Sequence, residues 1–334
     1  MKTRFFAAVM LLFLCLWLSF DTAQKIKYTC LSVSLRYEDA APLTAENVMA
    51  ARAFAQDSAN ENTLYPSFWR ETKSEIRAHQ KQENATVLYF LGSGDACYPA
   101  EFIVGGYPGD ADANGCALSA EAAWRLFGSN DILGQELVLQ NKTYVIRGVF
   151  KGRESVCLVG ATEKTPFAAM ELVGTNAADR RGQSLDFVQK AGLPKPAQIV
   201  YGPSIAAAVQ ALCFLPLCVC GAFLWAALWR KSKTWRPAQR EVFWFGAALC
   251  FALALPFLLA QLPAWLIPAK WSDVSFWQAL WHAATENLRA WLALVPSYKD
   301  VVLKERLLYY ALTLAVGIRF TQKICRLCIT KQQI

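Results

Sequence analysis

The acidic stretch from Asp110 to Glu121 has the spacing of a calcium-binding loop. It follows the pattern D-x-D-x-N-G-x5-E, with Asp110, Asp112 and Asn114 at alternate positions and Glu121 as the last member. Ca²⁺ prefers such oxygen ligands, and a glycine at the sixth position allows the sharp turn. Residues 102–109 resemble a strand and turn rather than the entering helix of an EF-hand, so an ion-free acidic loop is the competing interpretation. The sequence indicates no organic cofactor.

Cysteines offer a second kind of chemistry. Four of the eleven cysteines lie in the long polar region of residues 21–203, namely Cys30, Cys97, Cys116 and Cys157. Outside a cell, four cysteines permit two disulfides in three connectivities. Pairing of Cys97 with Cys116 is favoured because it would close the acidic loop at its base. Four free thiols are the alternative.

Groups that would make the chain an enzyme are missing from the sequence. The Walker A pattern for ATP does not occur, and the only histidines are His79 and His282. No acid, base and nucleophile are seen to converge. We therefore expect a protein that is not an enzyme.

Apolar segments divide the chain into several parts. These parts must position the acidic stretch and the cysteines described above. At a rise of about 1.5 Å per residue, a segment of about 20 residues crosses the hydrocarbon core of a bilayer. Pro216 and Pro256 are expected to kink two of the segments. The expected parts are residues 1–20 (anchor helix), 21–203 (outer domain), 204–229, 242–267 and 301–320 (second to fourth membrane helices), 230–241 (cytoplasmic basic loop), 268–300 (outer amphipathic segment) and 321–334 (cytoplasmic tail).

Charge gives the expected orientation. Residues 21–203 carry 18 basic and 21 acidic side chains, although the whole chain has a net charge of +8. The basic excess therefore flanks the apolar segments, which excludes a nucleic-acid-binding surface and indicates the cytoplasmic side of a membrane. We expect a multi-pass plasma or inner membrane protein with both termini in the cytoplasm and residues 21–203 outside.

The segment of residues 271–296 differs from a membrane span. Tryptophans and leucines recur at helical spacing from Trp277 to Leu292, while Asp273 and Glu286 fall elsewhere on the wheel. This pattern predicts an amphipathic helix at the outer membrane interface. Packing of the same stripe on the outer domain is the alternative.

Local signals in residues 21–203 predict an α+β domain. Helices are expected at residues 44–56, 66–82 and 120–127, the last between a capping Ser119 and a terminating Gly128. Strands are expected at residues 31–35, 86–91, 156–159 and 198–201, with a hairpin formed by residues 137–139 and 144–150. Helices and strands do not alternate regularly, which favours α+β over α/β.

Residues 98–152 carry a family resemblance. A helix with Leu118, Ser119, Ala123, Leu126, Phe127 and Gly128 is followed by Leu133-Gly134 and by a hairpin that ends in Ile146, Gly148 and Val149. This stretch resembles the periplasmic core domain of MacB-type (FtsX-like) ABC transporter permeases. The resemblance implies one helix, an outer domain and three further helices, which is the layout expected above from hydropathy and charge.

The same resemblance implies a function and its partners. It implies a permease subunit that works with a separate cytoplasmic ATP-binding subunit and forms a dimer with itself or with a similar permease. The ATPase would contact the basic loop, whose charged residues are Arg230, Lys231, Lys233, Arg236, Arg240 and Glu241. The family usually carries an arginine-alanine-leucine-glycine signature there, and this loop lacks it. A membrane-anchored accessory or receptor protein without ATPase coupling is therefore the alternative.

Overall fold

The computed structural model describes residues 2–38, 40–57, 63–110, 112–174, 180–260, 270, 272–293 and 297–330. The chain forms two compact units. The helical unit contains Met1–Lys27, Ser204–Thr285 and Asp300–Ile334, and the sheet unit contains Tyr28–Pro203 and Glu286–Lys299. The sheet unit thus includes a segment from the end of the chain's apolar region, which the expected boundaries of 21–203 leave out.

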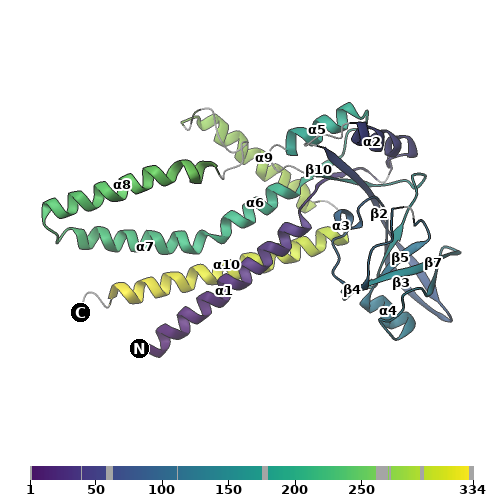
Figure 1. The fold of residues 1–334 in the computed structure, drawn as a ribbon, viewed down its shortest axis with the longest axis horizontal. Helices are drawn as coiled ribbons and strands as arrows, with labels where there is room; N and C mark the ends of the chain where they lie inside the picture. The colour runs from purple at the N-terminus through teal and green to yellow at the C-terminus, as the bar shows by residue number, and fades with distance from the viewer. Residues whose placement is uncertain are drawn as a thin grey trace. The chain divides into compact units, whose positions relative to one another are not determined.

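The sheet unit is built on one mixed ten-stranded sheet (Figure 1). Its strand order is β10-β1-β9-β2-β3-β8-β5-β7-β4, and β6 pairs with both β2 and β7. The β3–β8 and β5–β7 pairs are parallel, and the other pairs are antiparallel. The strands are β1 (Val33–Arg36), β2 (Leu64–Ala78), β3 (Lys81–Leu91), β4 (Phe102–Gly105), β5 (Gly115–Ser119), β6 (Glu136–Leu139), β7 (Lys142–Phe150), β8 (Val156–Gly160), β9 (Ala169–Gly174) and β10 (Gln198–Tyr201).

Four helices accompany this sheet: α2 (Ala45–Asp57), α3 (Gly94–Cys97), α4 (Ala120–Phe127) and α5 (Arg180–Lys190). The expected ends of α4 are confirmed, because the Ser119 hydroxyl accepts from the Ala122 N–H and Gly128 adopts a φ of 73°. The expected hairpin is also confirmed. Its two turn residues, Gln140 and Asn141, have φ values of 50° and 64°, as a type I′ turn requires.

The expected helix over residues 66–82 is wrong, because this segment is the long strand β2 and its turn into β3. Every residue of β2 from Phe68 to Ala78 pairs with β3, and its first half also pairs with β9. The charged residues in the middle of β2 favour a helix locally. Pairing on both sides, together with burial of Phe68, Trp69 and Ile76, outweighs that preference.

The core of the sheet unit consists of three groups of buried side chains. One group gathers around Leu35, Phe68 and Phe167, and a second gathers around Ile76, Leu118 and Ile146. A third, with Trp69, Phe90 and Phe150, contains many aromatic rings. Tyr89 of β3 is partly buried and packs against both the first and the second group. It therefore marks the seam between them.

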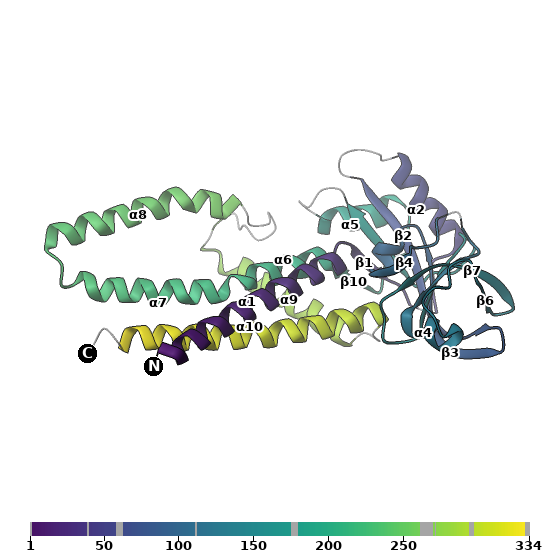
Figure 2. The same ribbon diagram turned by 60° about the horizontal axis from the view of Figure 1, so that its bottom comes forward.

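The long helices lie wholly or mostly in the helical unit. They are α1 (Lys2–Thr29), α6 (Gly202–Cys213), α7 (Leu215–Ser232), α8 (Pro237–Ala260), α9 (Val274–Ala293) and α10 (Tyr298–Thr330). The end of α9 from Glu286 and the first two residues of α10 belong to the sheet unit. Helix α1 continues nine residues past the expected end of the anchor at residue 20. Helices α1 and α10 lie side by side (Figure 2), and the Ser19 hydroxyl donates to Thr313 Oγ1 at 3.1 Å.

Two stretches of the described chain, Val9–Thr29 and Gly202–Ser232, have the length and apolar composition needed to cross a membrane. The second is interrupted at Phe214, where α6 ends and α7 begins with Pro216 in its first turn. This interruption confirms the expected kink. Helix α8 holds Pro256 inside it. The expected span of residues 242–267 continues beyond Ala260 into residues that lie outside the described part of the chain.

Candidate functional site: a buried charge cluster in the sheet unit

A buried glutamate lies at the centre of three adjacent strands. Glu171 of β9 stands opposite Ser34 of β1 and opposite Ser67 of β2 in the strand register. Its side chain is completely buried. An ionised carboxylate in such a place is costly unless it is paired and hydrogen bonded. Its neighbours must therefore explain how it is tolerated.

Hydrogen-bond donors surround the carboxylate of Glu171. The Ser32 hydroxyl donates to Oε2 at 2.5 Å, and the Ser34 hydroxyl donates to Oε1 at 2.7 Å. The indole Nε1–H of Trp69 also donates to Oε1, at 2.9 Å. Three uncharged donors, one from β1, one from β2 and one just before β1, thus hold the carboxylate in one orientation.

Two cations complete the cluster. Lys299 Nζ lies 3.2 Å from Glu171 Oε2, and the lysine side chain is only 8% exposed. The guanidinium of Arg36 lies 4.3 Å above the ring of Trp69, close enough for a cation–π interaction. We call Glu171, Lys299, Arg36, Trp69, Ser32 and Ser34 the buried charge cluster.

The pKa of Glu171 reflects this balance. Burial raises the pKa of a carboxyl group, because it penalises the charged form. The positive charges of Lys299 and Arg36 act in the opposite direction, and the serine hydrogen bonds add to them. The pKa of Glu171 falls from its ordinary value of 4.5 to about 2. The carboxylate is therefore charged at neutral pH.

Lys299 belongs to a short segment that the sheet unit holds at several points. Its ammonium group also donates to the carbonyl of Ala96 in α3 at 2.7 Å. The neighbouring Tyr298 stacks on Tyr98, with ring centroids 5.4 Å apart, and its N–H donates to Glu71 Oε2 at 2.8 Å. Tyr298 and Lys299 are the first two residues of α10. The sheet unit therefore binds the beginning of the last helix.

Ser32 and Ser34 are buried, and they donate to a carboxylate whose lowered pKa makes it a weak base. The arrangement is that of a structural joint, in which the Glu171–Lys299 charge pair fixes one segment to another. Sequence reasoning missed the cluster. The available signal was the isolated acid in an apolar strand, since Glu171 lies between Met170 and Leu172 in β9.

The candidate calcium ligands do not converge. Asp110 Oδ2 accepts from Arg52 at 2.9 Å, and its Oδ1 accepts from the Gly92 N–H at 2.9 Å. Asp112 is paired with Arg147 at 2.8 Å. Arginines thus neutralise the two aspartates that would otherwise need a cation.

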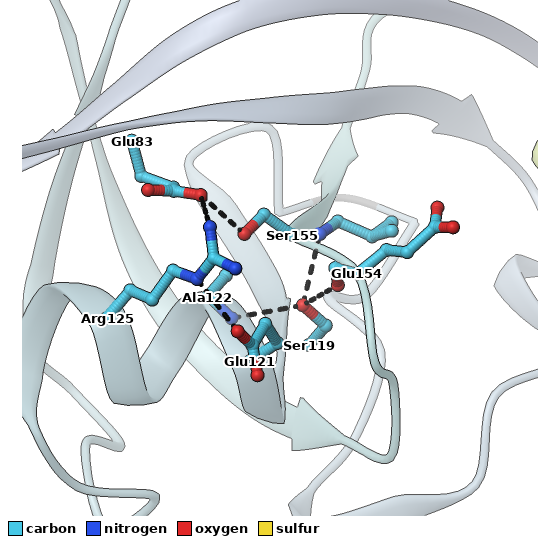
Figure 3. A network of polar contacts seen from close by, with 8 residues as sticks. Glu83, Ser119, Glu121, Ala122, Arg125, Glu154 and Ser155 are labelled. Carbon is cyan, nitrogen blue, oxygen red and sulfur yellow. Dashed lines mark hydrogen bonds and ion pairs between the residues drawn. The ribbon is translucent and has the colours of Figure 1, made fainter.

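Glu121 belongs to a different network (Figure 3). Arg125 lies between Glu121 and Glu83, at 2.8 Å and 2.6 Å, and Ser155 also donates to Glu83. Among the residues that the structure describes, neither Glu121 nor Asn114 forms a side-chain hydrogen bond with Asp110 or Asp112. Within the described residues, no group of three or more His, Cys, Asp or Glu side chains could hold a metal ion.

The structure places the four cysteines of the sheet unit as buried free thiols. Cys97 and Cys116, the pair favoured from the sequence, belong to different groups of core residues. The thiol that Cys116 contacts is Cys157, to which it is hydrogen bonded, and this contact and burial raise the pKa of Cys157. Burial likewise raises the pKa of Cys97.

The basic loop lies at the turn between α7 and α8. All six of its predicted contact residues are exposed, namely Arg230, Lys231, Lys233, Arg236, Arg240 and Glu241. The turn itself is braced by aromatic contacts, since Trp244 packs on Trp225 and Trp229 with centroid separations of 4.6 Å and 5.2 Å. A rigid turn thus presents a row of exposed cations.

Comparisons with known proteins find similar solved structures but no matching family and no matching curated protein. The extracellular domain of the noncanonic ABC-type transporter YknZ from Gram-positive bacteria is 14% identical, with a TM-score of 0.38, over 51% of this chain and 98% of that one. The periplasmic region of MacB from Actinobacillus actinomycetemcomitans is 8% identical, with a TM-score of 0.43, over 54% and 92%.

A domain of a putative permease protein from Porphyromonas gingivalis is 13% identical, with a TM-score of 0.37, over 49% of this chain and 85% of that one. All three structures are domains of transporters or permeases, the class that residues 98–152 resemble.

Proposed function

We propose that the chain is a permease subunit of an ABC transporter, which couples a separate cytoplasmic ATPase to a domain outside the cell. It is a multi-pass protein of the plasma or inner membrane, with four membrane helices and both termini in the cytoplasm. Residues 21–203 lie outside. Two such chains, or this chain and a similar permease, form the membrane part of the transporter. The ATP is hydrolysed by the partner subunit.

Sequence and layout support this assignment. The stretch of residues 98–152 resembles the core domain of MacB-type permeases, and it forms the α4 helix and the β6–β7 hairpin of the sheet unit. The larger segment of the sheet unit, Tyr28–Pro203, lies between α1 and α6 in the chain, as the resemblance implies. Positive charges cluster beside the apolar helices and leave the sheet unit slightly acidic.

The observation that carries the proposal is the ion pair between Glu171 and Lys299. It fixes Glu171, a buried residue of the sheet, to the first turn of α10. This helix is 33 residues long and ends at Thr330. A displacement of α10 along its axis would act directly on Lys299, and therefore on β9. A transporter that passes motion from cytoplasm to exterior needs a joint of this kind.

The basic loop is the proposed contact with the ATPase. Its exposed cations are free to meet an acidic surface, and the aromatic bracing of the α7–α8 turn would resist bending under load. The accessory or receptor alternative rests on the missing signature in this loop. The two functions differ in whether the loop binds an ATPase.

Co-purification separates these alternatives. The full chain is purified in mild detergent from its own cells, and ATPase activity is measured in the preparation. The charge-reversed variant Arg236→Glu/Arg240→Glu is compared with Lys164→Glu/Lys195→Glu, which reverses two exposed lysines of the sheet unit. A permease loses its associated ATPase only in the first variant.

The receptor alternative gives a different result. No ATPase then accompanies the wild-type chain under conditions that preserve related complexes, and reversal at Arg236 and Arg240 changes nothing. That outcome would remove the proposed coupling.

A further inference from the structure

A cavity of about 540 Å³ opens on the sheet unit, away from the buried charge cluster. Strands β2 and β3 form one wall, and the β6–β7 hairpin forms another. The end of β8 and the loop of residues 161–166 close the rest. The cavity lies along the seam that Tyr89 marks between two groups of core residues. Its volume is within the range of small-molecule sites.

Positive charge dominates the lining. Arg70 and Lys142 both face the cavity, and none of the described residues that line it is acidic. Lys142 is held in place by the carbonyl of Ala113, at 2.9 Å, and by the ring of Tyr144, whose centroid lies 4.7 Å from Nζ. It contributes a fixed positive charge at the rim.

Arg70 is the more informative of the two cations. It is half-buried on β2, directly opposite Tyr89 in the strand register. Its guanidinium makes no hydrogen bond or ion pair with any of the described residues. A half-buried guanidinium normally has acceptors for its five N–H groups. An anion in the cavity would supply them.

Thr72 adds an independent signal. It lies two residues beyond Arg70 on β2, and hence on the same face of the sheet. Its hydroxyl oxygen is buried without a hydrogen-bond partner among the described residues. Buried hydroxyls are nearly always bonded in folded proteins. A ligand that fills the cavity could bond this hydroxyl and Arg70 together.

The remaining walls suit an apolar group. Tyr89, Tyr144 and Leu139 line the cavity beside the cations. Flat aromatic rings next to a guanidinium match a ligand with an apolar body and one planar anionic end. We propose that this cavity binds small organic carboxylates, with the carboxylate at Arg70 and Thr72 and the apolar part against Tyr89 and Tyr144. This site lies within the sheet unit and requires no ATPase.

A matched pair of probes tests the site. The full chain in detergent is titrated with 4-(trifluoromethyl)benzoate and with its neutral amide, and binding is followed by fluorine NMR. The acid should bind at least about tenfold more tightly than the amide, because only the acid forms a charge-assisted pair with Arg70. Titration of each probe into protein-free micelles is the blank, because micelles take up the neutral amide more readily and would make its binding to the protein look weaker.

Two variants test whether Arg70 is responsible for the tighter binding of the acid. Arg70→Gln should weaken acid binding by about tenfold and leave the amide unchanged. Lys73→Gln is the control, because Lys73 is exposed and lies on the other face of the same strand. Equal binding of acid and amide by the wild-type chain overturns the proposal even if Arg70→Gln fails to fold. Retention of full acid affinity in a folded Arg70→Gln chain overturns it as well.

Discussion

Glu171 of β9 and Lys299 of α10 form an ion pair of 3.2 Å in which both side chains are shielded from solvent. The two residues are far apart in the sequence, and one of them starts an apolar helix. Isolated surface ion pairs contribute little to stability, but a buried pair is strongly destabilised when one partner is removed. The pair is therefore the most sensitive joint of the sheet unit.

Removal of one charge should destabilise the sheet unit. Lys299→Met leaves the Glu171 carboxylate buried without its main counter-charge, and we expect a loss of about 3–5 kcal/mol in unfolding free energy. Thermal unfolding of the full chain in detergent measures the change. Lys164→Met, which alters an exposed lysine, should leave the transition where it is.

The double variant Glu171→Gln/Lys299→Met tests directly whether the two residues interact. It removes both charges, so it should be more stable than Lys299→Met alone. If the two single effects simply add in the double variant, the residues do not interact and the joint does not exist.

Acid should weaken the same joint. The pKa of Glu171 is lowered from 4.5 to about 2, so the folded chain holds its proton less tightly than the unfolded chain does. The resulting stability, about 3 kcal/mol, is fully present above pH 4.5 and is lost as the pH falls towards 2. Unfolding followed between pH 6 and pH 2 should show this loss.

Glu171→Gln serves as the comparison for the acid effect. It cannot titrate, so its stability should fall less steeply over the same range. Parallel pH profiles for the two chains would show that Glu171 does not contribute.

Local signals in the sequence were sufficient for some elements and not for others. The cap at Ser119, the glycine stop at Gly128 and the β6–β7 hairpin were predicted correctly, because each depends on a few neighbouring residues. The turn of the hairpin was expected at Asn141-Lys142 and lies one residue earlier, at Gln140-Asn141. The strand β2 was predicted as a helix, because its identity depends on pairing with β3 and β9, which local sequence does not reveal. Strand β4 lies within residues 102–109, which were expected to form a strand and turn. Strands β5 and β9 were not predicted, because they are short and have no exposed residue, so they lack the alternation of buried and exposed positions that indicates a strand.

The same distinction between local and distant interactions explains which features of the site could be predicted from the sequence. The acids of residues 110–121 matched a ligand pattern, but the arginines that pair with them come from α2, α4 and β7. Glu171 is an isolated acid in an apolar strand, but the sequence does not identify Lys299 as its partner, and only the tertiary structure brings the two together. Spacing along a chain detects ligands from one loop and misses partners from distant elements.

Calcium should have no effect on the sheet unit. Asp110 and Asp112 already have arginine partners, and a cation would have to displace them. The unfolding temperature should therefore be equal in millimolar calcium and in chelator. A clear rise in calcium that is abolished by Asp112→Asn would restore the calcium loop.

Labelling in intact cells tests the orientation of the chain. The proposed topology places Lys164 outside and Arg236 in the cytoplasm, because basic loops are retained on the cytoplasmic side. Both side chains are exposed in the structure. A membrane-impermeant thiol reagent should therefore label Lys164→Cys in intact cells and label Arg236→Cys only after the cells are broken. The parent chain measures the reaction of the native thiols, which are buried throughout the sheet unit. Labelling of Arg236→Cys in intact cells would invert the topology, and the basic loop could then not meet a cytoplasmic ATPase.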